Sequence, residues 1–201
     1  FVERDVLEHT TALVQLRGIP GTTCAVQFIL HGGTTADVFF EGAEGKARDN
    51  DGDGREEVQT EMVAMNLTGG GVTLRLAPGQ VTRGEIEERV NTLLGTLDVA
   101  PFSTGLADSF FDVFFELEVG QGTQAQVLHN AQPLRVQAVI SEKPPIARYL
   151  HVIPPSGPIE LLTAAGQPSG IFLVQAEHYT GFVERDVMEQ TTALVQLRGI
   201  P

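Results

Sequence analysis

Residues 109–119, SFFDVFFELEV, define the fold best, because their side chains alternate in character over the whole stretch. Every second residue is large and apolar, whereas the residues between them mix carboxylates with Phe110 and Phe114. Side chains of a strand point alternately to its two faces, so this pattern predicts a strand with one face in the core. The two rings on the mixed face indicate that part of that face is also covered. The predicted core face consists of Phe111, Val113, Phe115, Leu117 and Val119.

Similar short stretches, rich in β-branched and aromatic residues and bounded by Gly or Pro, recur along the rest of the chain. Strands at such regular spacing predict an all-β fold, namely an antiparallel β-sandwich with Greek-key-like connections. At most one short helix is expected, at residues 83–94, where early acidic residues suit a helix start. The other predicted strands lie at residues 11–17, 24–31, 36–41, 58–67, 72–77, 127–129, 134–141, 149–153, 159–162 and 171–176.

The composition excludes several classes of function. The chain has 201 residues, a formal net charge of −13 and 42% hydrophobic residues. A surface this acidic repels phosphate backbones and anionic lipid surfaces, so neither a nucleic-acid partner nor membrane insertion is expected. The single cysteine, Cys24, excludes an intrachain disulfide framework. It lies in an apolar run and is predicted to be a buried structural thiol.

The chain ends with a near copy of its own beginning. Residues 1–20 and 182–201 are identical at 18 of 20 positions, at an offset of 181 residues. This repeat predicts that residues 1–181 are one complete β-sandwich repeat unit and that residues 182–201 are the first strand segment of the next unit. The two segments should then lie about 40–50 Å apart, one unit diameter. Duplication of the first and last strands within one domain is the alternative, and the two copies would then pair side by side.

Three aspartates at alternate positions form the sharpest local motif. Asp49, Asp51 and Asp53 are followed by Gly54, which gives the D-x-D-x-D-G opening of a calcium-binding loop. Carboxylates at every second position of a tight loop converge on one point, and Ca²⁺ takes six to eight oxygen ligands. The alternative interpretation is a solvated acidic turn. We predict a Ca²⁺ site here.

The rest of this loop supplies the remaining predicted ligands. Arg55 would offer its backbone carbonyl at position seven, and Glu57 falls at position nine. The loop departs from the EF-hand pattern at position twelve, where Thr60 replaces the usual Glu and Glu61 follows one residue late. The predicted ligand set is therefore the three aspartates, Arg55 and Glu57, with Glu61 nearby.

Two further features bear on modification and catalysis. Asn66 begins an N-x-T sequon next to a glycine run, which predicts an exposed glycosylation site. An ordinary strand-end asparagine is the alternative. The five histidines are scattered, and the sequence contains neither H-E-x-x-H nor G-x-S-x-G. The sequence therefore predicts a protein that is not an enzyme.

Several whole phrases of the sequence are similar to a known kind of repeat. The chain resembles the long-period repeats of very large secreted proteins of environmental bacteria. The resemblance implies tandem arrays of β-rich domains on the cell surface or in extracellular fibres, with Asp49, Asp51 and Asp53 as calcium ligands. The phrases are EEVQTEMVAMNLTG (56–69), GEIEERVNTLLGTLDVAPF (84–102), ADSFFDVFFELEV (107–119), VLHNAQPLRVQAVISEKPP (127–145) and PIELLTAAGQPSGI (158–171).

The repeat, the loop and the resemblance together predict a structural function. The chain would be a repeat unit of an extracellular bacterial fibre or surface layer, stabilised by Ca²⁺. Its expected partners are neighbouring copies of the same repeat, joined by strand-mediated contacts, together with covalently attached glycans. The alternative is a repetitive, adhesin-like binding module on the cell surface.

Overall fold

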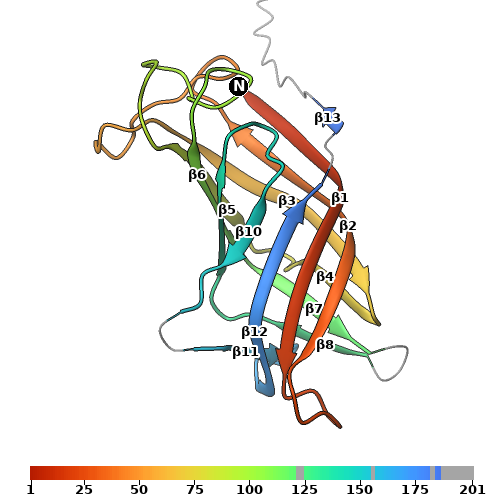
Figure 1. The fold of residues 1–201 in the computed structure, drawn as a ribbon. Coiled ribbons are helices and arrows are strands. Elements are labelled where there is room, and N and C mark those ends of the chain that lie inside the picture. The colour runs from red at the N-terminus through yellow and green to blue at the C-terminus, as the bar shows by residue number, and fades with distance from the viewer. Residues whose placement is uncertain (121–124, 155–156, 182–183, 187–201) are drawn as a thin grey trace, which may run out of the picture.

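The computed structural model describes residues 1–120, 125–154, 157–181 and 184–186, and it is built from β-strands (Figure 1). This described part contains thirteen strands and no helix, and so no helix that could cross a membrane. The strands are β1 (Val2–Arg17), β2 (Val26–Phe39), β3 (Glu57–Gly69), β4 (Val72–Leu76), β5 (Thr82–Glu88), β6 (Ala107–Val113), β7 (Phe115–Val119), β8 (Gln126–His129), β9 (Leu134–Ile140), β10 (Arg148–His151), β11 (Ile159–Thr163), β12 (Pro168–Thr180) and β13 (Glu184–Asp186).

The strands form one antiparallel sheet that closes on itself, because β12 pairs with β1. The barrel consists of two stacked rings of paired strands. Four long strands, β1, β2, β3 and β12, belong to both rings. The lower ring continues through β4, β7, β8 and β11, and the upper ring through β5, β6, β9 and β10 (Figure 1). Each strand position pairs with its sequence neighbour, so the fold is an up-and-down barrel with eight strand positions, four of which are shared by two short strands.

The predicted all-β antiparallel class is confirmed, but the arrangement of the strands differs from the prediction. One closed sheet takes the place of two packed sheets, and the connections follow a meander where a Greek key was expected. The physical reason is strand length: β1 has 16 residues and β2 has 14. Such strands reach through both rings, and closure leaves few unpaired edges.

The predicted helix at residues 83–94 is wrong, since β5 occupies its first half. Thr82, Gly84, Ile86 and Glu88 are buried, while the residues between them are more exposed. Burial in this segment therefore follows a period of two, which suits a strand between β3 and β6.

The stretch 109–119 forms β6 and β7, and its predicted core face is confirmed for every residue up to Leu117. On the opposite face, Phe110 lies beneath the guanidinium group of Arg135, 3.9 Å from the ring centroid. The two strands are separated at Phe114, where the side chain of Asn130 replaces the sheet's own hydrogen bonds. Asn130 accepts a hydrogen bond from the Phe115 N–H (2.9 Å) and donates one to the carbonyl of Val113 (2.8 Å).

The second copy of the terminal repeat lies beside the first where it is described. Residues 184–186 form β13, which pairs antiparallel with residues 4–6 of β1. The predicted separation of about 40–50 Å is therefore wrong for these three residues, which show the side-by-side pairing expected from duplication within one domain. Residues 182–183 and 187–201 lie outside the described residues, and the division into units at residue 181 stays a prediction.

Candidate functional site

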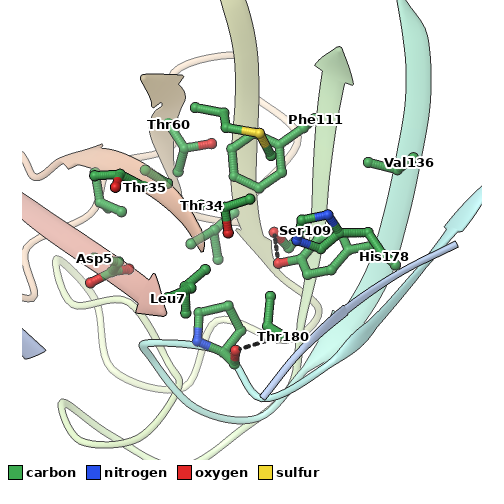
Figure 2. Close-up of a pocket in the computed structure, with 16 residues that line it drawn as sticks. Asp5, Leu7, Thr34, Thr35, Thr60, Ser109, Phe111, Val136, His178 and Thr180 are labelled. Atoms are coloured by element: carbon green, nitrogen blue, oxygen red, sulfur yellow. Dashed lines mark hydrogen bonds between the residues drawn. The ribbon is translucent and has the colours of Figure 1, made fainter. Parts of the chain in front are cut away.

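The interior of the barrel holds two adjoining cavities, lined by the inward-facing side chains of the strands. The upper cavity measures about 30 Å³ and the lower about 40 Å³. Met62, Val136 and His178 line both, so these three side chains separate the cavities. The lower cavity is lined almost entirely by apolar residues, including Met65 and Phe115. The polar residues of the upper cavity, most of them labelled in Figure 2, are Asp5, Thr34, Thr35, Thr60, Ser109, Tyr149, His178 and Thr180.

Three polar side chains from different strands meet at one wall of the upper cavity (Figure 2). The hydroxyl oxygens of Tyr149 and Ser109 are hydrogen-bonded at 2.9 Å, and the Tyr149 ring meets the His178 ring edge-on at 6.2 Å. Burial raises the pKa of Tyr149 to about 12 and lowers the pKa of His178 to about 4. Both are therefore uncharged at neutral pH, and each can donate and accept hydrogen bonds.

The opposite side of the same cavity carries an unsatisfied hydroxyl. Thr60 is 3% exposed, and its Oγ1 has no hydrogen-bond partner among the described residues. Gly84 of β5 makes room for it, because a Cβ there would lie 2.6 Å from this oxygen and 2.1 Å from the Phe110 carbonyl oxygen. A buried polar group without a partner costs about 1–3 kcal/mol. A ligand atom that bonded Thr60 would remove this cost.

A buried ion cluster lies at the upper end of the interior. The Nζ of Lys143 lies 2.9 Å from Asp5 Oδ2 and 3.1 Å from Glu3 Oε1, and no side chain of the three is more than 3% exposed. Burial raises the pKa of the Asp5 carboxyl to about 6, although the Lys143 ammonium acts in the opposite direction. Because Asp5 also lines the upper cavity, the charge on this wall changes in weakly acidic solution.

The acidic loop before β3 brings part of the predicted metal site together. One carboxylate oxygen each from Asp49, Asp51 and Glu57 lies within 4.8 Å of the others, so the group could hold a metal ion. Asp49 also accepts a hydrogen bond from the N–H of Gly52, which fixes the turn of the loop. Glu57 is 4% exposed, and its Oε2 has no partner in the described part of the chain. This oxygen is available to a cation.

The other predicted ligands are arranged differently. Asp53 accepts a hydrogen bond from the Arg55 Nε (2.8 Å), and this bond lowers the pKa of Asp53. Asp53 instead belongs to a second group, with Asp51 and Glu87 of β5, and Arg55 also forms an ion pair with Glu87 at 2.9 Å. Glu61 lies within β3 and belongs to neither group. Glu87 could not be found from the loop sequence, because it enters from another strand.

The sequence also made predictions for Asn66 and Cys24. Asn66 is exposed in β3, opposite Gly33 of β2, and its glycosylation stays a prediction. Cys24 is exposed, so the predicted buried thiol is wrong. The apolar run that contains Cys24 enters β2 only at Val26, and the cysteine lies in the preceding turn.

The fold and the interior place the chain in a broad structural class. Barrels with eight strand positions enclose a space just wide enough to be filled by side chains or to hold one small ligand. The structure is similar to that of DynF from the dynemicin biosynthesis pathway of Micromonospora chersina, with a TM-score of 0.66 and 17% sequence identity. The match covers 90% of this chain and 80% of that chain. No family model and no curated protein sequence matches the chain.

This likeness corrects the prediction that the chain is not an enzyme. That prediction rested on the absence of local catalytic motifs, whereas the barrel is shared with a protein of a biosynthetic pathway. Local sequence motifs do not reveal the interior polar groups of this barrel, because those groups come from strands that are far apart in the sequence. Ser109 and Tyr149, for example, are separated by 40 residues and still share a hydrogen bond.

Few local signals in the sequence point to these interior groups. Glu3 and Asp5 alternate with more exposed residues at the start of β1, as core residues do, but their charge suggests a solvent-facing strand end. A shift in register between Leu7 and Thr10 also changes the phase of the alternation. Lys143 stands out only as one of two lysines in the chain.

Proposed function

We propose that the barrel interior binds a slender, largely apolar small molecule with one polar end, in a biosynthetic role. The observation that carries this proposal is the pair of interior cavities that meet at Met62, Val136 and His178. The apolar body of the ligand would lie in the lower cavity and its polar end in the upper one. An apolar enclosure with a few convergent polar groups is the usual form of such sites.

The size of the cavities limits the ligand. A buried water needs roughly 10–15 Å³ of such volume, so each cavity, at about 30 and 40 Å³, has room for only a few water-sized groups. A larger ligand therefore requires side chains to move. Met62 and Met65 are suited to this, because methionine is unbranched and adapts its shape at low cost.

The polar end of the ligand is defined by the groups that would meet it. The Thr60 hydroxyl lacks a partner, and the Tyr149–Ser109 pair can rearrange to donate or accept. A hydroxyl or carbonyl group fits these neutral partners. An anionic end is disfavoured, because Asp5 lines the same cavity and is ionised above about pH 6.

The proposal predicts binding of a neutral apolar probe, N-phenyl-1-naphthylamine, whose fluorescence rises on burial. Val136→Phe fills the boundary between the cavities and is expected to weaken binding about tenfold or more. Val139→Phe is the matched control, because Val139 lies on the same strand but is exposed on the outer face. Met62→Ala joins the cavities and should strengthen binding. Fluorescence titration measures all three, with circular dichroism as the check on folding.

Two results would contradict interior binding. One is the absence of any saturable probe binding to the wild-type chain. The other is a loss of affinity in Val139→Phe that Val136→Phe does not show, which would place the probe on the outer surface.

We propose further that Asp49, Asp51 and Glu57 bind Ca²⁺. Three carboxylates are hard oxygen ligands, and the unpartnered Oε2 of Glu57 supports a cation at this point.

Calcium at one hundred times its Kd should stabilise the fold by about 2.7 kcal/mol, and EDTA should reverse the gain. Thermal unfolding measures this, with Glu57→Gln expected to abolish the effect and Glu61→Gln to retain it. An unchanged Tm in Ca²⁺ would refute the site.

The fibre function, the adhesin alternative and the extracellular location remain proposals from the sequence. They concern the outer surface and the parent array, whereas the binding site proposed above lies inside the barrel. Both functions are therefore compatible with one chain. A negative-stain image of the native material, as filament or dispersed chain, tests the fibre.

A further inference from the structure

The buried cluster at the upper end of the barrel holds an amine and a carboxyl group in contact. The Nζ of Lys143 donates hydrogen bonds to both carboxylate oxygens of Asp5, at 3.0 and 2.9 Å. The Asp5 Cγ lies between these two oxygens, so its distance from Nζ falls within the near-attack range of about 3–3.5 Å. The amine nitrogen and the carbon to which it could bond are therefore already adjacent.

The backbone on each side keeps the two groups in place. Asp5 lies in β1, where it pairs with Ala36 of β2. The N–H of Lys143 donates to the carbonyl of Ala100 at 2.7 Å, and Nζ lies 5.5 Å from the centre of the Phe40 ring. Reacting groups that are oriented within one molecule reach effective molarities of about 10⁵–10⁸ M. Condensation of this amine with this carboxyl is thereby favoured over the same reaction between free molecules.

The surroundings favour the neutral forms that react. The side chains of Lys143 and Glu3 are fully buried, and that of Asp5 is 3% exposed. Burial raises the pKa of Asp5 to about 6, and the nearby Glu3 carboxylate acts in the same direction, although Lys143 opposes both. Passage of one proton from Nζ to the Asp5 carboxylate removes both charges, and burial disfavours charged groups. The products of this transfer are a neutral amine and a carboxylic acid.

We propose that Lys143 and Asp5 form an intramolecular isopeptide bond, which ties β1 to the segment between β9 and β10. The Nζ lone pair attacks Cγ of the protonated Asp5 carboxyl, so that one C–N bond forms and one C–O bond breaks. Glu3, whose Oε1 lies 3.1 Å from Nζ, takes the displaced amine proton and passes it to the departing oxygen. This oxygen leaves with two protons as one water molecule, so the reaction needs no oxidant and no co-reactant.

The chain then has two forms. In the ion-paired form, which is the one in the structure, Asp5 and Lys143 carry opposite charges; in the cross-linked form neither group titrates. The freshly folded chain is in the ion-paired form, and the effects of these charges on stability belong to that form. The cross-linked form accumulates afterwards, because the two groups meet only when the barrel has closed. The reaction requires no ligand in the interior.

The test is the intact mass of the full wild-type chain during incubation at about pH 6, where the Asp5 carboxyl is half protonated. We expect the chain to lose the mass of one water molecule. Lys143→Arg should lose none, because a guanidinium group keeps its proton. Lys46→Arg is the matched control, since Lys46 is the other lysine and is exposed, and it should react like the wild type. Glu3→Gln should slow the reaction about a hundredfold or more, and an unchanged rate would overturn the proton transfer by Glu3.

Trypsin digestion locates the bond. The cross-linked chain should yield residues 5–17 joined to residues 136–148, lighter by one water than the two peptides together. A bond through Glu3 would join residues 1–4 to residues 136–148 and would overturn the assignment to Asp5. Lys143 is not cleaved, because Pro144 follows it, and the cleavage sites used are Arg4, Arg17, Arg135 and Arg148.

Two results for the wild type would overturn the inference, and neither depends on the folding of a variant. One is an unchanged mass after prolonged incubation, with no joined peptide in the digest. The other is a loss of water without the joined peptide, as succinimide formation at an aspartate elsewhere would produce.

Discussion

Replacement of Lys143 by methionine is expected to lower the free energy of unfolding by about 3–5 kcal/mol at pH 7–8. Methionine keeps the length of the side chain and its place near the Phe40 ring, which lies 5.5 Å from Nζ. It removes the only cation within hydrogen-bonding distance of Asp5 in the described part of the chain. Asp5 would then remain buried without the ammonium group that compensates its charge. Urea denaturation at constant m value measures the loss.

A second variant separates the charge effect from packing. The triple variant Glu3→Gln, Asp5→Asn, Lys143→Met removes all three charges with little change in volume. Neutral replacement of a buried ion cluster is often close to neutral in stability, so most of the loss should be recovered. If the single variant loses less than about 1 kcal/mol, in the range of an exposed ion pair, the cluster is not a buried electrostatic unit.

The second expected result is a pH-dependent difference in stability between the wild type and Asp5→Asn. Asp5 has a pKa of about 6 in the fold, above its ordinary value of 3.8, so the folded state binds more protons between these values. Stability contributed by this group is present below about pH 4 and is lost as the pH rises to about 6. Each pKa unit is worth about 1.4 kcal/mol, so the wild type should lose about 3 kcal/mol relative to the variant over this range.

The pKa of His178 is shifted in the opposite direction to that of Asp5. Its pKa is lowered to about 4, so the unfolded state binds the extra proton, and stability rises with pH between about 4 and 6.5. The difference between the wild type and His178→Phe should therefore have the opposite slope to that of Asp5→Asn. Urea titrations at half-unit pH intervals measure both slopes. Equal slopes for the two variants would contradict the assigned burial of these groups.

The strands were the most predictable part of this protein. The alternation in residues 109–119 identifies the buried side chains correctly up to Leu117. This signal is local, because alternation is a property of a single strand. The predicted helix at residues 83–94 was wrong because that prediction also rested on a local signal. The pattern of charge resembled a helix start, while pairing with β3 and β6 determined the conformation.

The metal loop was partly predictable. Alternate carboxylates in residues 49–53 indicated where oxygen ligands gather, and Asp49, Asp51 and Glu57 do lie together. The sequence could not show that Arg55 neutralises Asp53, because the direction of that side chain depends on Glu87 in β5. The tertiary structure therefore decides which of these carboxylates can bind a cation.

The sequence by itself determined the all-β class, most of the strands, the core face of residues 109–117 and the near copy at the two ends. These follow from local periodicity and from identity of residues. Only the tertiary structure decided that the sheet closes, since closure requires β1 to meet β12. Closure also created the interior site and placed Lys143 against Asp5, 138 positions away in the chain. Contacts at such separation depend on pairing between distant strands, and no local pattern records them.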